Sequence, residues 1–157
     1  YKLSQQDYED QFNFLITIRD KFNEMQKAQK NIRDVRKQIN DFTDKQGKGL
    51  DKEIKQQADT INKQMTVIEE ALHQTKAKSG QDVLNYPIRL NDKLSGVFDA
   101  ANSGNMAPSK QSKDVFAVLT AQCDDQLNKL KKIMEEDVVK FNQLIRDKAL
   151  PVIGVGK

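Results

Sequence analysis

An apolar stripe in the first quarter of the chain constrains the fold more than any other feature of the sequence. Its side chains recur at steps of three, four or seven residues, and they are Tyr8, Leu15, Ile18, Phe22, Met25, Ile32, Val35, Ile39 and Phe42. This spacing places them on one face of a single helix. No Gly or Pro interrupts the stripe, so at about 1.5 Å per residue the helix extends for roughly 55 to 60 Å. The chain therefore opens with a long helix that needs partners for one face.

Local signals set the ends of this first helix. Ser4 followed by Asp7 resembles a capping box, in which the hydroxyl and the carboxylate each accept a backbone N–H at the helix start. Near the other end, Gly47 and Gly49 permit the backbone geometry of a helix terminus and a tight reversal. We expect a helix over about residues 4–44, followed by an antiparallel neighbour.

The next two helices are shorter. A stripe that alternates threes and fours predicts a helix over about 50–76, and its members are Leu50, Ile54, Ala58, Ile61, Met65, Ile68, Leu72 and Thr75. After an aperiodic connection, Pro87 suits a first helical turn because it has no amide hydrogen to leave unpaired. It predicts a helix over about 87–102, whose apolar members are Ile88, Leu90, Leu94, Val97, Phe98 and Ala101.

The last helix is again long. Ser109 is a favourable N-cap, and Pro151 prevents continuation, so we expect a helix over about 109–149. Its stripe is Phe116, Leu119, Cys123, Leu127, Leu130, Ile133 or Met134, Asp137 or Val138, Phe141, Leu144 and Ile145, with two positions that the spacing leaves open. The apolar tail 150–157 could either fray or pack against the bundle, and the sequence leaves both possibilities open.

Four helices with one apolar lane each are expected to form an all-α, antiparallel four-helix bundle with the long pair as its spine. With 31% charged and 6% aromatic residues among 157, the composition is typical of long helices. We expect one domain over residues 1–157, and the start at Tyr1 without Met suggests a fragment of a larger protein or a processed chain.

The charge pattern argues against nucleic acid and membrane. Basic and acidic residues are interleaved, with ten against eight in residues 1–50, seven against eight in 51–100 and nine against seven in 101–157. A nucleic-acid binder would gather Lys and Arg on one face, and a membrane-surface helix would place them opposite a wide apolar face. No run of 18 apolar residues occurs. We therefore expect neither nucleic-acid binding nor membrane insertion.

No residue pattern indicates catalysis, a cofactor or a metal. Adjacent carboxylates, such as Glu69 and Glu70, point about 100° apart on a helix, so we expect them on solvated faces. His73 has no His or Cys three or four residues away, and we expect it at the surface or at the boundary of the core. Cys123 lies on an apolar lane, which favours a small buried side chain over a reactive thiol.

Three segments carry a family resemblance, namely residues 61–72, 85–94 and 141–146. Together they resemble the C-terminal helical region of large bacterial proteins that begin with a sortilin-like, BNR-repeat β-propeller and are often labelled glycosyl hydrolases. The resemblance covers about residues 3–152. It implies an exported protein of a Bacteroidetes-type bacterium, in which this chain is a helical appendage to the propeller. It transfers no catalytic residue.

Within these segments, Tyr86, Arg89 and Asn91 are the candidate docking surface for the propeller or another protein, because aromatic and Arg side chains are favoured anchors. A structural alternative is that Tyr86 and Pro87 set the entry angle of the helix while Asn91 caps a buried contact. We predict a noncatalytic structural or protein-interaction module. A self-associating coiled-coil module, which would form a homodimer, is the alternative. A hydrolase-associated domain is the remote one.

Overall fold

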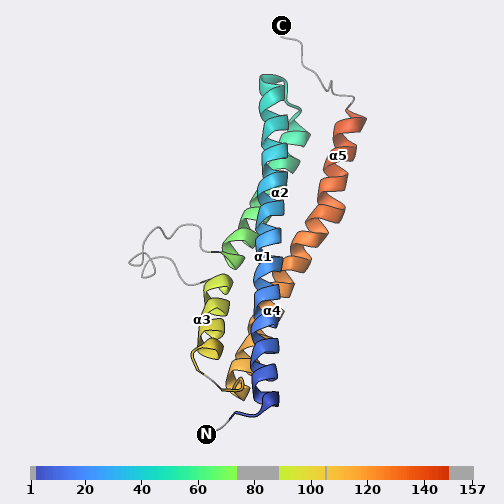
Figure 1. The fold of residues 1–157 in the computed structure, drawn as a ribbon. Helices are drawn as coiled ribbons and strands as arrows, with labels where there is room; N and C mark the ends of the chain where they lie inside the picture. Colours follow the sequence, from blue (N-terminus) through green and yellow to red (C-terminus); the bar gives the residue numbers. More distant parts are fainter. Residues whose placement is uncertain (1–2, 74–88, 105, 149–157) are drawn as a thin grey trace, which may run out of the picture.

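The computed structural model describes residues 3–73, 89–104 and 106–148, and within these ranges the secondary structure is entirely helical. The elements in chain order are α1 (Gln5–Gln46), η1 (Gly47–Gly49), α2 (Lys52–Leu72), α3 (Leu90–Asn102), α4 (Lys110–Lys132), η3 (Ile133–Asp137) and α5 (Val138–Asp147). The prediction of an all-α helical bundle is confirmed (Figure 1).

The predicted caps of the long helices are confirmed. At the start of α1 the Asp7 N–H donates to Ser4 Oγ at 3.1 Å, and the Ser4 N–H donates to Asp7 Oδ2 at 2.9 Å. Gly47 ends α1 with a φ of 55°, in the region that favours glycine. The side chain of Ser109 caps α4 by accepting the Ser112 N–H at 3.0 Å.

Two predicted helix starts are wrong by a few residues. The second helix begins at Lys52 rather than 50, because Asp51 Oδ1 accepts the N–H groups of Glu53 and Ile54 and so acts as the N-cap. The third begins at Leu90 rather than 87, since Arg89 has extended backbone with φ −101° and ψ −179°. The predicted end of the second helix at about 76 is also wrong, because α2 ends at Leu72 and His73 has extended backbone with φ −131° and ψ 139°. Pro87 itself and the tail 150–157 lie outside the described residues.

The two long helices run in the same direction. The Phe14 and Phe116 rings pack edge to face with centroids 5.5 Å apart, and the Phe42 and Phe141 rings do so at 6.3 Å. Early residues of α1 therefore meet early residues of α4, and late residues of α1 meet α5. The expected antiparallel packing holds between α1 and α2, and it does not hold for this long pair.

The helices α2 and α3 both run against α1, one beyond the other. Arg36 Nη1, late in α1, contacts Glu69 Oε1 in the last turns of α2 at 3.4 Å. Gln11 Nε2, early in α1, donates to the carbonyl of Ala101 at the end of α3 at 3.0 Å. Helices of 21 and 13 residues can each cover only part of the 42-residue α1. Among the described residues, a cross-section of the rod therefore contains α1, the helix formed by α4 to α5, and either α2 or α3. Figure 1 shows α2 and α3 at different levels of the rod.

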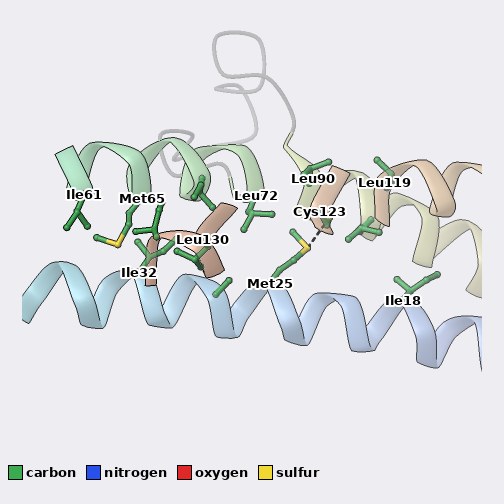
Figure 2. Close-up of a cluster of buried hydrophobic side chains, with 14 of the residues drawn as sticks. Ile18, Met25, Ile32, Ile61, Met65, Leu72, Leu90, Leu119, Cys123 and Leu130 are labelled. Atoms are coloured by element: carbon green, nitrogen blue, oxygen red, sulfur yellow. Dashed lines mark hydrogen bonds between the residues drawn. The ribbon is translucent and has the colours of Figure 1, made fainter. Parts of the chain in front are cut away.

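The core follows the predicted stripes. In Figure 2 side chains from α1, α2, α3 and α4 converge in the space between these helices. The fully buried members are Ile18, Met25, Ile32, Ile54, Met65, Leu72, Leu94 and Cys123. Tyr8 is an error of the prediction, since its side chain is 48% exposed. It lies about one turn before Gln11, which contacts the end of α3, so α3 does not extend far enough along α1 to cover it.

The last helix contains one turn of π-helix, η3, that the sequence analysis did not predict. The N–H of Val138 donates to the carbonyl of Ile133, five residues earlier. One extra residue is thereby accommodated between α4 and α5. The stripe was ambiguous at 133 or 134 and at 137 or 138, which are the positions where this extra residue shifts the register. The described helix ends at Asp147.

We expect deletion of Glu136, an exposed residue of η3, to be tolerated. Removing one residue from a π turn restores a regular α-helix and preserves the faces of α4 and α5 on either side. The unfolding midpoint, followed by circular dichroism, should change little. Deletion of Ala121, exposed within regular α4, is the matched control. It rotates its neighbours by about 100° and should destabilise the protein strongly, and equal effects of the two deletions would contradict the assignment.

Candidate functional site

The predicted docking residues occupy the start of α3. Arg89 is the N-cap residue of that helix and is partly exposed. Asn91 follows in the first turn, where its Oδ1 is buried and accepts no hydrogen bond from the described residues. Tyr86 lies outside the described residues. A joint docking surface of the three residues stays a prediction, although Arg89 does line a cavity of about 270 Å³.

That cavity belongs to a longer depression, which we call the seam groove. It comprises four cavities with one wall from α2 and α3 and the other from α4, η3 and α5, and α1 contributes to none of them. Adjacent cavities share lining residues, namely Lys93, Gln126, Gln64 and Asp137. The groove therefore follows the rod on the side that α1 leaves uncovered.

The middle of the seam groove is apolar. A cavity of about 490 Å³ has Val67, Ile68 and Ile133 among its lining residues. Val67 points outward, with 62% of its surface exposed. At the edge of the same cavity, Gln126 Oε1 is buried and without a hydrogen-bond partner in the described ranges. Apolar surface beside a few polar groups that fix orientation is the usual composition of a binding site.

These groove residues were not predicted from the sequence. Val67 is an aliphatic residue outside the stripe of its helix, which passes through Met65 and Ile68. Such a residue is a weak signal because single exposed apolar side chains are common on protein surfaces. Only the packing of α2 against α4 shows that Val67 lies beside Ile133 in one depression.

Most of the charged side chains that line the seam groove without forming an ion pair are basic. Lys129 Nζ lies 3.1 Å from Asp125 Oδ2, and Glu53 Oε2 lies 3.3 Å from Lys148 Nζ. The lining charges that form no ion pair with any residue of the described ranges are Arg89, Lys93, Lys132, Lys140 and Asp137. Four of these five are positive.

One predicted solvated carboxylate is buried instead. Glu69 is 8% exposed, against the expectation for the Glu69 and Glu70 pair. Arg36 Nη1 lies 3.4 Å and 3.5 Å from its two carboxylate oxygens, and Arg36 Nη2 donates to Thr66 Oγ1 at 3.0 Å. This contact joins α1 to α2 on the side away from the groove's lining. It is a structural ion pair, which a single sequence shows only as two distant charged residues.

His73 lies at the boundary of the core, as predicted, with a partly exposed side chain, whereas Cys123 is fully buried. Burial lowers the pKa of His73, outweighing the nearby carboxylate of Glu69. The Cys123 thiol donates to Met25 Sδ at 3.7 Å, and burial raises its pKa to about 11. The prediction of a small buried side chain at Cys123 is confirmed. Within the described ranges no three His, Cys, Asp or Glu residues form a cluster able to hold a metal ion.

Cys123 is expected to resist thiol reagents in the native state. The reactive form is the thiolate, and a thiol with a pKa of about 11 is protonated at pH 8. Iodoacetamide at pH 8 should leave the native chain unlabelled and label it fully in denaturant, as read by intact mass. The raised pKa also implies that stability is lost as pH rises from about 9 toward 11. Rapid native labelling at pH 8 would contradict the burial.

The structure places the chain in the class of elongated all-α bundles. No helix in the described ranges is both long and apolar enough to span a membrane. Searches against family models, curated proteins and solved structures find no match to this chain.

Proposed function

We propose that this chain is a noncatalytic helical module that binds another polypeptide. The seam groove is the observation that carries the proposal, because it is a long, partly apolar depression that no helix of the described chain covers. A rod three helices thick offers a partner an extended face. Most titratable groups of the described residues form ion pairs, are spread along the surface or, like Cys123, lie in the core. They do not form the convergent acid–base arrangement that general acid–base catalysis requires.

The family resemblance supports a more specific version of this proposal. In it the chain is appended to a sortilin-like β-propeller in an exported bacterial protein, and the propeller or a further protein is its partner. Arg89 fits that version, since it lies on the groove wall at the start of α3. No hydrolase activity is proposed for the chain itself.

Self-association is the second candidate. Val67 and Val115, which are exposed and line the seam groove, are the observation that favours it, since an uncovered apolar face can be buried by a second copy. A dimer formed in this way would occupy the groove with the same surface that lines it, in an isologous contact.

Light scattering on a sizing column at two concentrations tests the proposal. A mass near 18.0 kDa at both concentrations is expected, because the stripes of α1 to α5 are already buried against one another. The open face would then be available to a different polypeptide. About twice this mass would overturn the proposal in favour of self-association.

A further inference from the structure

We propose that the seam groove binds one long amphipathic α-helix with acidic flanks, supplied by a different polypeptide. This inference rests on the proposed function and specifies the shape and charge of the partner. It follows from the groove's length, its apolar floor and the sign of its unpaired charges.

The groove has the dimensions of a helix site. Along α4, η3 and α5 its lining extends from Gln111 to Lys140, which is about 44 Å at 1.5 Å per residue. A depression of this length beside a rod three helices thick is where a fourth helix would complete a four-helix section. A small ligand would fill only one of its cavities, whereas a helix contacts them in succession.

The floor provides the apolar contacts that such a helix requires. Val67 and Ile133 lie in the middle cavity, and Val115 and Leu119 line the cavity near the α3 end. Helices that bind in grooves insert apolar side chains at steps of three or four residues. Gln126 Oε1, buried without a partner in the described ranges, is placed to accept one hydrogen bond from the incoming helix.

The charges select an acidic partner. Arg89 and Lys93 lie on the α3 wall, and Lys132 and Lys140 lie on the α4 to α5 wall, so both edges carry unpaired positive charge. Asp137 is the one unpaired acid among the lining residues of the described ranges. Glu or Asp residues flanking the apolar stripe of the partner would meet these edges, and complementary charge of this kind confers specificity and a fast association rate.

The same charges disfavour a second copy as the occupant. In an isologous dimer built on this face, the groove of one copy would meet the groove of the other. Four unpaired positive charges of each copy would then face the same four of its partner. Like charges brought together in this way oppose association.

The test uses two synthetic helical peptides of about 28 residues, matched to the groove length. Both carry Leu at the a and d positions of four heptads. One has Glu at the flanking e and g positions, and the other has Lys. Fluorescence anisotropy of each labelled peptide, titrated with the whole chain at low salt, is expected to show binding of the Glu peptide at least about tenfold tighter than that of the Lys peptide.

Two variants with matched exposure locate the site. Val67→Glu places a negative charge in the groove, and Val139→Glu places one outside it. The two replaced side chains are similarly exposed, Val67 at 62% and Val139 at 53%. Both should fold with similar melting curves. Val67→Glu is expected to weaken binding of the Glu peptide by at least about tenfold, and Val139→Glu is expected to weaken it by less than about twofold.

The outcomes separate this inference from the proposed function. Equal binding of the two peptides, or equal loss in the two variants, would overturn the acidic-helix site. A monomer that binds neither peptide would also overturn it, and would leave the interaction module intact with its contact elsewhere. A dimer that Val67→Glu converts to a monomer would make a second copy the occupant, which overturns this inference and the proposed function together.

Discussion

Replacing Ile32 with alanine is expected to lower the free energy of unfolding by about 2 to 5 kcal/mol, the usual cost of truncating a fully buried aliphatic side chain. Ile32 is 0% exposed. In Figure 2 it lies between α1 and the side chains of Met65 and Leu130. Its loss would leave a cavity at the level where α1, α2 and α4 meet, and helices held by neighbours on two sides collapse poorly into such a space.

Urea denaturation followed by circular dichroism measures this loss. At about 2 to 4 °C per kcal/mol for a chain of this size, the melting temperature should fall by roughly 4 to 20 °C. Val118→Ala is the control, because its side chain is 58% exposed on α4 and should cost less than about 0.5 kcal/mol. An Ile32→Ala variant as stable as Val118→Ala would show that these three helices do not pack as described.

Replacing Arg36 with methionine is expected to cost about 3 kcal/mol, because it leaves a buried carboxylate without its counter-charge. The Glu69 side chain retains only 10% of its exposure, and Arg36 is the cation within 4 Å of it. Methionine keeps most of the aliphatic length of arginine, so the loss reports the charge more than the packing. We place the effect at the lower end of the range for buried pairs because the Arg36 side chain is 26% exposed.

The double variant Arg36→Met with Glu69→Met isolates that contribution. Replacing both partners of a buried ion pair by apolar residues is often neutral, so the double variant should recover most of the stability that Arg36→Met loses. Chemical denaturation of the four species gives the coupling free energy directly. A double variant less stable than Arg36→Met alone would contradict the burial of Glu69.

Local structure was largely predictable from the sequence. Helix existence follows from stripes such as Ile18, Met25 and Ile32, whose spacing is a property of one chain segment. Caps at Ser4 and Ser109 follow from side chains that bond to backbone within three residues. Errors arose where two local signals competed. Asp51 displaced Leu50 as the start of α2, and the extended Arg89 delayed α3 despite the suitability of Pro87 for a first turn.

Relations between distant segments were not predictable in the same way. Apolar stripes show that helices pack, but they leave open which end of α4 meets which end of α1. That choice depends on contacts such as Phe14 with Phe116, over a hundred residues away along the chain. The seam groove depends on the same information, because Val67 and Ile133 become neighbours only when α2 and α4 are placed together.

The π turn is a local feature that affects the packing of distant segments. Its extra residue changes the face that α5 presents, and both Ile133 and Asp137, its first and last residues, line the seam groove. Single π turns recur at functional positions of helices. Here the turn lies between the apolar middle of the groove and the cavity that Glu53 and Lys140 line. A regular helix at this point would arrange those groove walls differently.

The seam groove as described depends on the parallel direction of the two long helices, because that direction sets which residues of α4 to α5 face α2 and α3. Pulsed electron spin resonance can measure it with nitroxide pairs at Asn13 and Lys113, and at Gln38 and Lys140, all exposed positions, in a Cys123→Ala background. Both pairs are expected to give distances of about 30 Å or less, because packed helix axes lie about 8 to 10 Å apart. An antiparallel long pair would instead separate the labels of each pair by about 35 Å or more along the rod, and distances in that range would rule out the parallel packing of α1 with α4 and α5.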